Sequence, residues 1–270
     1  MRFGLRVSRY FSYGAVTAIL GFVLAPVVLV VWISFFSQQL ILFPPKGYSL
    51  AWYQNILNQK NFINAFILSF QVALAATALS MIIGLLASIG LTRFKLPGKS
   101  TLQSLFLSPL VVPVIITGMA MYIFFIRLQR MMGVELVPSF MVLVLAHVII
   151  TIPWTVRLIT AGLTGINEEL EEAAMDLGAS KWRAFWRITL PIIRPSIVAA
   201  GIFAFIFSFG NLEVSLMLVS PGETTIPIEI LNYVFWKMDP TIAAVATVKI
   251  VITGILMLIA DRVVGLSNVF

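Results

Sequence analysis

A chain of 270 residues with 60% hydrophobic and only 11% charged residues cannot cover a water-facing surface, because soluble domains carry about 25% charged residues. Membrane lipid is therefore its expected surrounding. The net charge of +7 does not indicate nucleic-acid binding, because no basic stretch is long or interleaved with aromatic residues. The lack of cysteine excludes disulfides and thiolate metal sites, and the single histidine, His147, excludes a histidine-rich metal site.

Six apolar runs of about 20 residues predict membrane-spanning helices. In chain order they cover about residues 13–36, 63–91, 102–126, 140–156, 197–219 and 241–264. Each must be helical, because lipid offers no hydrogen-bonding partner to an open backbone. The first run follows three arginines but is longer than a signal-peptide core, so we interpret it as a retained span. The prediction is an all-α integral membrane protein with six transmembrane helices in a single domain, residues 1–270.

The cations between the spans predict the orientation. With a cytoplasmic N-terminus, the inner segments hold twelve of the 18 lysine and arginine residues and the outer segments hold five. Cytoplasmic segments carry the excess of lysine and arginine in membrane proteins. We therefore expect both termini in the cytoplasm.

The inner segment 157–196 is too polar to span a membrane, and its pattern predicts two short helices. The first begins after Asn167, a suitable N-cap, and ends at Gly178, which permits a turn that a side chain would block. A second amphipathic stretch covers residues 181–189, and Pro191 is expected to stop it. The acids of the first helix, which the helix dipole favours near its start, are Glu168, Glu169, Glu171 and Glu172. We expect this loop to receive a cytoplasmic partner.

Seven residues of this loop stand at a fixed spacing. They are Glu172, Ala173, Ala174, Gly178, Ile188, Leu190 and Pro191. The pattern resembles the EAA motif of the permease subunits of ABC importers. In that family the motif forms the coupling helix that docks into the ATPase subunit, so the resemblance implies an ATPase-coupling role for these residues and for the adjacent Glu171. The alternative is an ordinary amphipathic inner loop.

Three further stretches resemble the spermidine/putrescine branch of these permeases, in which this chain is similar to the second permease. They are residues 48–53, 176–180 and 221–227. The resemblance covers most of the chain and implies the type I ABC importer permease fold in a bacterial inner membrane. It also implies three partners: a second permease subunit, two copies of an ABC ATPase, and an extracytoplasmic substrate-binding protein.

The chain has no Gly-rich phosphate-binding loop followed by Lys-Ser or Lys-Thr, and it offers no catalytic set. It is therefore expected to be a non-catalytic transport subunit that binds no cofactor and no metal itself. ATP and magnesium would be bound through the partner ATPase.

Charged residues inside spans are costly and indicate functional sites. Glu213 in the fifth span and Lys249 in the sixth lie at similar depths, so they can pair with each other or face a charged solute. Further candidates on the fifth span, which can equally hydrogen-bond between helices, are Ser208, Asn211 and Ser215.

The substrate class stays open between two chemistries. Permeases similar to this one tend to carry acids at the positions of Gly210 and Asn211, which suits a polycation, whereas this chain has neither acid and adds Lys249. The solute is therefore expected to be a polyamine or a related opine or amino-acid derivative.

Two other classes of protein are also open at this point. An ion-coupled secondary transporter often shows internal repeats and discontinuous helices, but the last three spans show no convincing repeat of the first three. A membrane-embedded enzyme would need a cluster of titratable or metal-binding residues. The spans offer only His147, Glu213 and Lys249, on three different helices.

Overall fold

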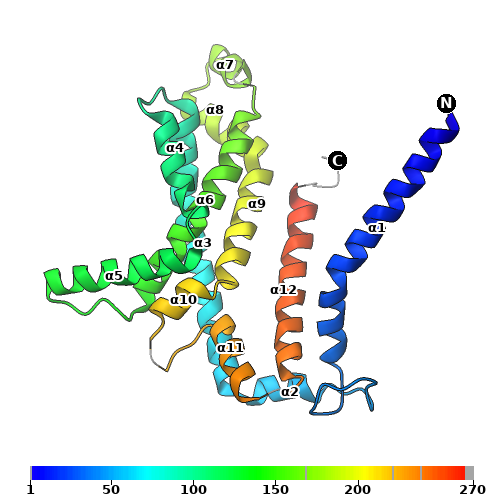
Figure 1. Cartoon of the computed structure of the whole chain (residues 1–270). Coiled ribbons are helices and arrows are strands. Elements are labelled where there is room, and N and C mark those ends of the chain that lie inside the picture. The colour runs from blue at the N-terminus through cyan, green and yellow to red at the C-terminus, as the bar shows by residue number, and fades with distance from the viewer. Residues whose placement is uncertain (1, 168, 221, 238, 265–270) are drawn as a thin grey trace. The chain divides into compact units, whose positions relative to one another are not determined.

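The computed structural model describes residues 2–167, 169–220, 222–237 and 239–264. These residues form helices and connecting segments (Figure 1), with a single isolated β-bridge between Phe36 and Tyr48. The α-helices are α1 Arg2–Ile33, α2 Ala51–Asn58, α3 Lys60–Arg93, α4 Lys99–Leu107, α5 Val114–Met132, α6 Phe140–Thr164, α7 Glu169–Asp176, α8 Lys181–Ala184, α9 Leu190–Phe209, α10 Glu213–Leu218, α11 Ile226–Trp236 and α12 Thr241–Val264. A 3₁₀ turn covers Ser108–Leu110, and a π-helical turn covers Phe185–Thr189.

Six helices within the described residues are long and apolar enough to cross a membrane, as the sequence predicted. They are Tyr13–Ile33, Lys60–Arg93, Val114–Met132, Phe140–Thr164, Lys181–Phe209 and Thr241–Ile259. The all-α membrane architecture is thereby confirmed. The cytoplasmic placement of the termini stays a prediction.

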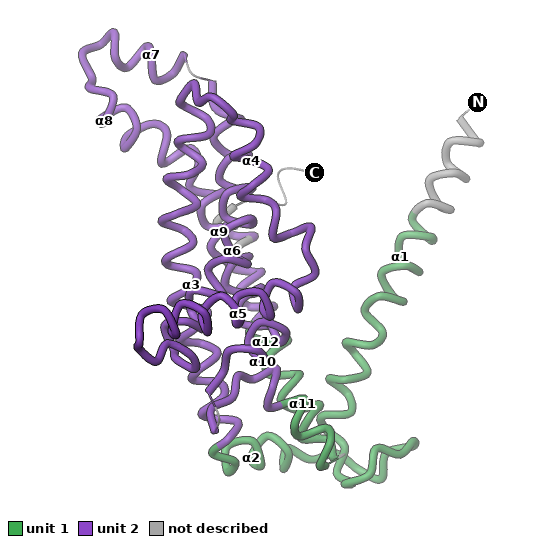
Figure 2. The backbone as a smooth tube through the Cα atoms, turned by 60° about the vertical axis from the view of Figure 1, so that its left-hand side comes forward, with its two compact units in different colours: residues 1–60, 230–252 green, residues 61–229, 253–270 purple. Residues whose placement is uncertain are grey.

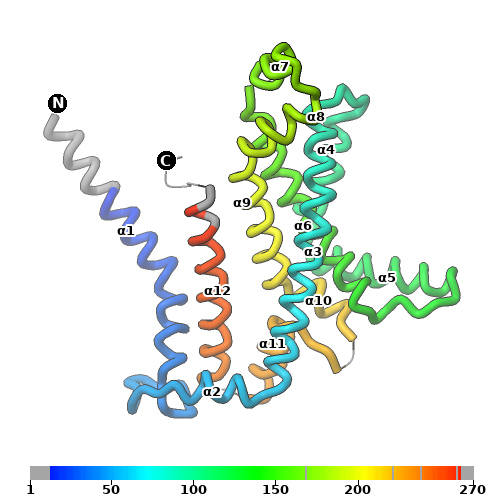
Figure 3. The backbone as a smooth tube through the Cα atoms, turned by 180° about the vertical axis from the view of Figure 1, so that it is seen from behind, coloured from blue at the N-terminus to red at the C-terminus, as the bar shows by residue number. Residues whose placement is uncertain are grey.

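The third expected span, residues 102–126, is interrupted in the structure. Helix α4 gives way to the 3₁₀ turn, and α5 starts only at Val114. Pro109 and Pro113 explain the break, because proline has no amide hydrogen for a helical bond. In Figures 1 and 3, α5 points away from the bundle of α3, α6 and α9. The apolar length that crosses a membrane here therefore begins about three turns later than predicted.

The fifth expected span, residues 197–219, differs in the same way. Helix α9 ends at Phe209, and the short α10 begins at Glu213. The side-chain oxygen of Asn211 accepts a hydrogen bond from the backbone nitrogen of Val214 at 2.9 Å and so starts the new helix. The apolar run continues across this break, which is why hydropathy alone joined the two helices.

The chain divides into two compact units (Figure 2): Met1–Lys60 with Ile230–Ile252, and Asn61–Glu229 with Thr253–Phe270. We call them unit 1 and unit 2. That they form one permease domain stays a prediction.

In unit 1, the end of α1 packs on the start of α12 through Ile33, Phe36 and Ala243. The side chain of Asn55 on α2 donates to the Thr241 hydroxyl at 3.0 Å. From residue 13 to residue 29 every side chain of α1 is exposed, which leaves a long apolar surface for lipid or another membrane subunit.

In unit 2, α6 packs along α9, and close contacts fix α3 against α6. Ile159, Leu163, Ile193 and Ala200 form a buried cluster between α6 and α9. The Ser88 hydroxyl on α3 donates to the carbonyl oxygen of Val156 on α6 at 3.1 Å. Three long helices are thus held together at the end of unit 2 that carries α7 and α8 (Figures 1 and 3).

Candidate coupling site and solute path

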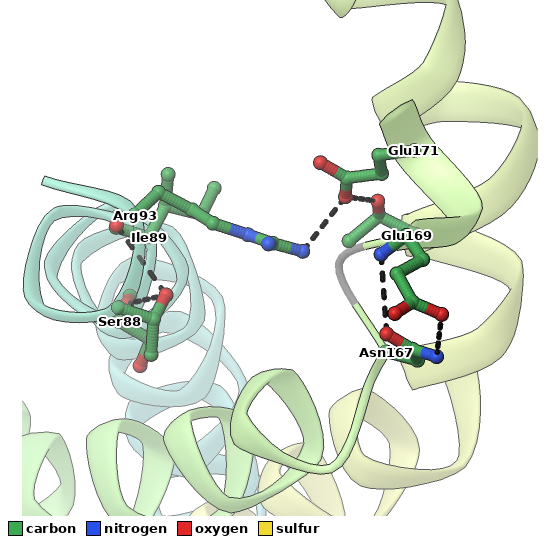
Figure 4. Close-up of polar contacts among 8 residues, drawn as sticks. Ser88, Ile89, Arg93, Asn167, Glu169 and Glu171 are labelled. Atoms are coloured by element: carbon green, nitrogen blue, oxygen red, sulfur yellow. Dashed lines mark hydrogen bonds and ion pairs between the residues drawn. The ribbon is translucent and has the colours of Figure 1, made fainter. Parts of the chain in front are cut away.

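Helix α7 begins where the sequence predicted. The Asn167 side chain accepts from the Glu169 backbone nitrogen at 3.1 Å and donates to the Glu169 carboxylate at 2.9 Å (Figure 4). Asn167 is therefore the expected cap, which satisfies one of the free amide groups at the helix start. Glu168, the first acid of the predicted cluster, lies outside the described residues.

Gly178 ends α7 with a paired set of backbone hydrogen bonds. Its own nitrogen donates to the carbonyl of Met175 at 2.9 Å, and the Ala179 nitrogen donates to the carbonyl of Ala174 at 3.0 Å. This is the Schellman arrangement, in which the residue after the helix adopts a left-handed conformation. Gly178 has a φ of +90°, which L side chains rarely adopt, and a Cβ here would meet no atom within 4 Å. The backbone conformation, rather than lack of space, requires glycine.

The second helix of the loop does not stop at Pro191, contrary to the sequence prediction. The Ser180 hydroxyl caps α8 by accepting from the Arg183 nitrogen at 3.3 Å, and the π turn then leads directly into α9. Pro191 lies in the first turn of α9. Proline has no amide hydrogen to donate at this position. It is tolerated there because the wider π turn before it changes the backbone hydrogen-bond pattern. The second half of the loop is therefore continuous with the membrane helix.

The two faces of α7 differ in exposure. Leu170, Ala173 and Leu177 follow one another at helical spacing on the outer face, and Leu170 is 48% and Leu177 90% exposed. Glu172 is also exposed, whereas Ala174 is half-buried. An apolar stripe at this spacing fits a groove on a partner protein.

Glu171 points to the opposite side, toward the protein. Its Oε1 atom lies 2.7 Å from the Nη2 atom of Arg93, the last residue of α3 (Figure 4). The Thr189 hydroxyl donates to the same carboxylate. The Arg93 and Glu171 side chains are only 20% and 21% exposed. A hollow of about 460 Å³ adjoins them, and its other charged lining residues are Glu172 and Lys181.

The remaining motif residues lie at the start of α9. Leu190 packs on the buried cluster of α6 and α9, and Ile188 is half-buried within the π turn. Pro191 is exposed. The structure therefore places Glu172, Ala173 and Gly178 on the exposed part of the loop. The last three residues of the motif lie where the loop joins the membrane helix α9.

Three of the solute-path candidates gather around His147 on α6. The Nδ1 atom of His147 lies 2.8 Å from the Ser208 hydroxyl, and Nε2 lies 3.1 Å from the Ser215 hydroxyl. Ser215 in turn donates to the backbone oxygen of Asn211 at 2.9 Å. All four residues are buried, with His147 only 1% exposed. The arrangement joins α6 to the break between α9 and α10, and lining of the solute path by the three candidates stays a prediction.

Replacing His147 with leucine is expected to lower the melting temperature of the detergent-purified protein. The change leaves the buried Ser208 hydroxyl without its histidine partner, which costs about 1–3 kcal/mol, and removes one of the two hydrogen bonds of Ser215. Thr164→Val is the control, because the Thr164 hydroxyl is exposed and donates within its own helix. If Ser208→Ala or Ser215→Ala abolishes uptake without lowering the melting temperature, these serines line the solute path and do not stabilise the fold through His147.

Glu213 and Lys249 belong to different units. Glu213 is the first residue of α10 in unit 2 and is half-buried, and no cation of the described residues in that unit forms an ion pair with it. Its position is fixed by Gly118 on α5, where a Cβ would lie 3.2 Å from the Cα of Val214. Lys249 is half-buried on α12 in unit 1. Their pairing stays a prediction.

Sequence reasoning missed three features of these sites. Arg93 was counted only as an inner cation and Thr189 only as part of an amphipathic stretch. Glu229 in α11 was overlooked, although an acid in an apolar helix is a usable signal. It is 8% exposed and accepts a hydrogen bond from the Thr224 hydroxyl at 3.1 Å.

Comparison with known proteins places this architecture in a family. Residues 80–268 match the family described as binding-protein-dependent transport system inner membrane component. The chain is 32% identical over 240 residues to the putrescine transport system permease protein PotI of Escherichia coli K12, covering 88% of this chain and 85% of that protein. It is 28% identical over 263 residues to the spermidine/putrescine transport system permease protein PotC of Haemophilus influenzae, covering 97% of this chain and all of that protein.

The fold is similar to that of a bacterial alginate ABC transporter solved in complex with its alginate pentasaccharide-bound periplasmic protein. The TM-score is 0.73 at 17% sequence identity, over 95% of this chain and 94% of the other. This similarity confirms the predicted permease fold, and the family match decides against an ion-coupled secondary transporter or a membrane-embedded enzyme. The chain belongs to the binding-protein-dependent transport system inner membrane component family and is a multi-pass permease subunit of an ABC importer.

Proposed function

We propose that this chain is the second permease of a heterodimeric importer that passes a polyamine or a chemically related amine across a bacterial inner membrane. The observation that carries the proposal is the 32% identity to a permease named for putrescine transport, extending over 88% of the chain. An extracytoplasmic binding protein delivers the solute, and two copies of an ATPase supply the energy. ATP and magnesium are bound by those ATPase subunits and not by this chain.

The loop around α7 is the proposed binding site of the ATPase. Its exposed face carries Leu170, Ala173 and Leu177, with the carboxylate of Glu172 beside them. A groove with apolar walls and a cation at its rim would match this face. Since the loop connects α6 to α9 directly, a displacement of α7 is transmitted to two packed membrane helices.

The distribution of cations supports a cytoplasmic position for this end of unit 2. The connection from the end of α3 to the start of α4, which carries Arg93, Lys95 and Lys99, lies at the same end as α7 and α8 (Figures 1 and 3). Two basic segments that are distant in sequence thus meet at one membrane face, as expected for the cytoplasmic side.

The acids of unit 2 favour a cationic group on the solute. Glu213 is half-buried beside the break that follows α9, and Glu229 is buried in an apolar helix. Buried carboxylates in membrane proteins are expensive and mark solute pathways or internal pairs. Lys249 on α12 of unit 1 carries the opposite charge, so an amine that also bears a carboxylate stays a second candidate for the solute.

Uptake into proteoliposomes that contain the purified transporter and its binding protein tests the substrate. Radiolabelled putrescine is the probe, and unlabelled spermidine, octopine and glutamate are the competitors. ATP-dependent putrescine uptake that spermidine alone suppresses supports a polyamine importer. Absence of putrescine uptake, with ATP hydrolysis stimulated by octopine or glutamate, would overturn the polyamine assignment in favour of an amino-acid-derived solute.

Reversing the charges of Glu213 and Lys249 separates a structural pair from a solute site. Glu213→Lys alone is expected to reduce the amount of protein in the membrane, because an unpaired charge in the hydrocarbon region costs about 2.5–3.5 kcal/mol. The double variant Glu213→Lys with Lys249→Glu should restore the amount of protein but not putrescine uptake, measured in the same vesicles. Full uptake by the double variant would make the pair merely structural.

A further inference from the structure

We infer that Glu171 is a positioning residue that fastens the coupling helix α7 to α3 and α9, so that the three elements move together when the ATPase acts. The inference rests on the proposed docking of an ATPase at α7. It separates the acids of the loop into two roles: the exposed Glu172 faces the partner, and the inward Glu171 transmits its movement to the membrane helices.

The contacts of Glu171 reach two helices at once. Its carboxylate accepts a charge-assisted hydrogen bond of 2.7 Å from Arg93 at the end of α3 (Figure 4). It also accepts a hydrogen bond from Thr189, at the junction of the π turn with α9. Charge-assisted hydrogen bonds are about twice as strong as neutral ones. Thr189 itself is fully buried, so its hydroxyl cannot turn to water when the carboxylate moves away.

Helix α7 is short, and its side chains pack only shallowly against its neighbours. It has eight residues, and none of its side chains is fully buried. A helix of this length is marginal by itself, because nucleation is unfavourable and few backbone hydrogen bonds form. Asn167 and Gly178 define its ends but leave its rotation relative to α3 and α9 free. The inward carboxylate supplies that constraint.

The helices that receive the constraint are fixed to one another. Ser88, one turn and a half before Arg93, donates to the Val156 carbonyl of α6 at 3.1 Å and accepts from the Thr160 hydroxyl at 3.1 Å. On the other side of α6, a Cβ added to Gly162 would lie 2.7 Å from the Cβ of Ser196 on α9. A movement delivered through Glu171 therefore reaches α3, α6 and α9 as one packed body.

The test compares substitutions that keep shape but remove one contact. Glu171→Gln removes the charge, and Thr189→Val removes the hydroxyl. Glu135→Gln is the matched control for the acid, because Glu135 is an exposed residue of the segment after α5. Thr164→Val is the control for the hydroxyl. The complete transporter is reconstituted, and co-purification of the ATPase, ATP hydrolysis and putrescine uptake are measured.

Glu171→Gln and Thr189→Val are expected to keep the ATPase bound and hydrolysing ATP, while uptake per ATP hydrolysed falls at least about fivefold, the lower end of typical coupling between sites. Glu171→Asp, which keeps the charge, should recover most of the loss. Wild-type uptake per ATP in both variants would overturn the inference. Loss of the bound ATPase in Glu171→Gln would also overturn it, because Glu171 would then be a docking contact.

A second readout needs no solute, so it distinguishes a wrong substrate from a wrong role for Glu171. The chain contains no cysteine. Spin labels can therefore be placed at two exposed positions, through Asp176→Cys on α7 and Arg194→Cys on α9. The distance distribution between them is expected to be narrow with Glu171 present and broad in Glu171→Gln. If the wild-type transporter takes up no putrescine, this comparison alone decides, and an unchanged distribution would refute the positioning role.

Discussion

Replacing Gly178 with aspartate is expected to reduce solute uptake strongly while the chain stays in the membrane. The residue has a φ of +90°, and a left-handed conformation costs an L residue about 1–2 kcal/mol. The new carboxylate would also lie at the negative end of the α7 dipole, at a further cost of about 0.3–1 kcal/mol. A change of about 1.4 kcal/mol is a factor of ten in an equilibrium constant, so uptake should fall by about tenfold or more.

Two control substitutions separate charge, strain and location. Gly178→Asn has the same shape without the charge and tolerates the left-handed conformation better, so it should retain part of the uptake. Gly133→Asp introduces the same acid at another helix end with a φ of +69° and no atom within 4 Å. Because Gly133 ends α5 and not α7, this variant should transport normally. Wild-type uptake by Gly178→Asp would count strongly against docking at α7.

Replacing Gly84 with alanine is expected to destabilise unit 2 strongly. A Cβ at this position would lie 2.6 Å from the Cβ of Thr155 on α6 and closer still to the Thr155 hydroxyl oxygen. Helices α3 and α6 would have to separate, and overpacking of this kind costs about 1–3 kcal/mol. The melting temperature in detergent should therefore fall, and uptake should fall with it.

Gly90 on the same helix provides the matched control. A Cβ there meets no atom within 4 Å, so Gly90→Ala should leave the protein unchanged or stabilise α3 by up to about 1 kcal/mol through helix propensity. The double variant Gly84→Ala with Thr155→Gly exchanges the small and large residues and should recover part of the lost stability. Equal melting temperatures for Gly84→Ala and Gly90→Ala would show that α3 and α6 do not approach each other this closely.

Local signals in the sequence were sufficient for α7. The side chain of Asn167 and the backbone freedom of Gly178 act within a few residues, so the start and end of this helix could be predicted and are confirmed. The six apolar helices were likewise predictable, because length and hydropathy are properties of a continuous segment.

Hydropathy did not locate the breaks inside apolar segments, because it does not register backbone geometry. The run 102–126 has no charged residue to mark Pro113 as a boundary, and in 197–219 the polar residues Asn211 and Glu213 were taken as part of one continuous span. At Pro191 the error was the opposite one, because a helix end was predicted where the helix continues. Proline was expected to stop the helix, but the π turn before it leads directly into α9.

The contacts of Glu171 could not be predicted at all. Arg93 lies 78 residues and Thr189 lies 18 residues from Glu171 in the chain. A single sequence gives no sign that these three side chains meet. For the same reason Ser208 and Ser215 were taken as candidates for the solute path, and their contacts with the ring of His147 were not predicted.

If an ATPase drives this permease through α7, a cross-linker attached at the end of α7 should capture that ATPase. Leu177→Cys gives the otherwise cysteine-free chain a single reactive thiol at a position that is 90% exposed. The tagged variant is treated with a thiol-specific photo-cross-linker in native membranes and purified, and the products are identified by mass spectrometry. We expect a P-loop ATPase cross-linked at residue 177 and a second permease purified with the complex. No ATPase at residue 177, together with uptake driven by an ion gradient in liposomes that contain this chain alone, would contradict this expectation.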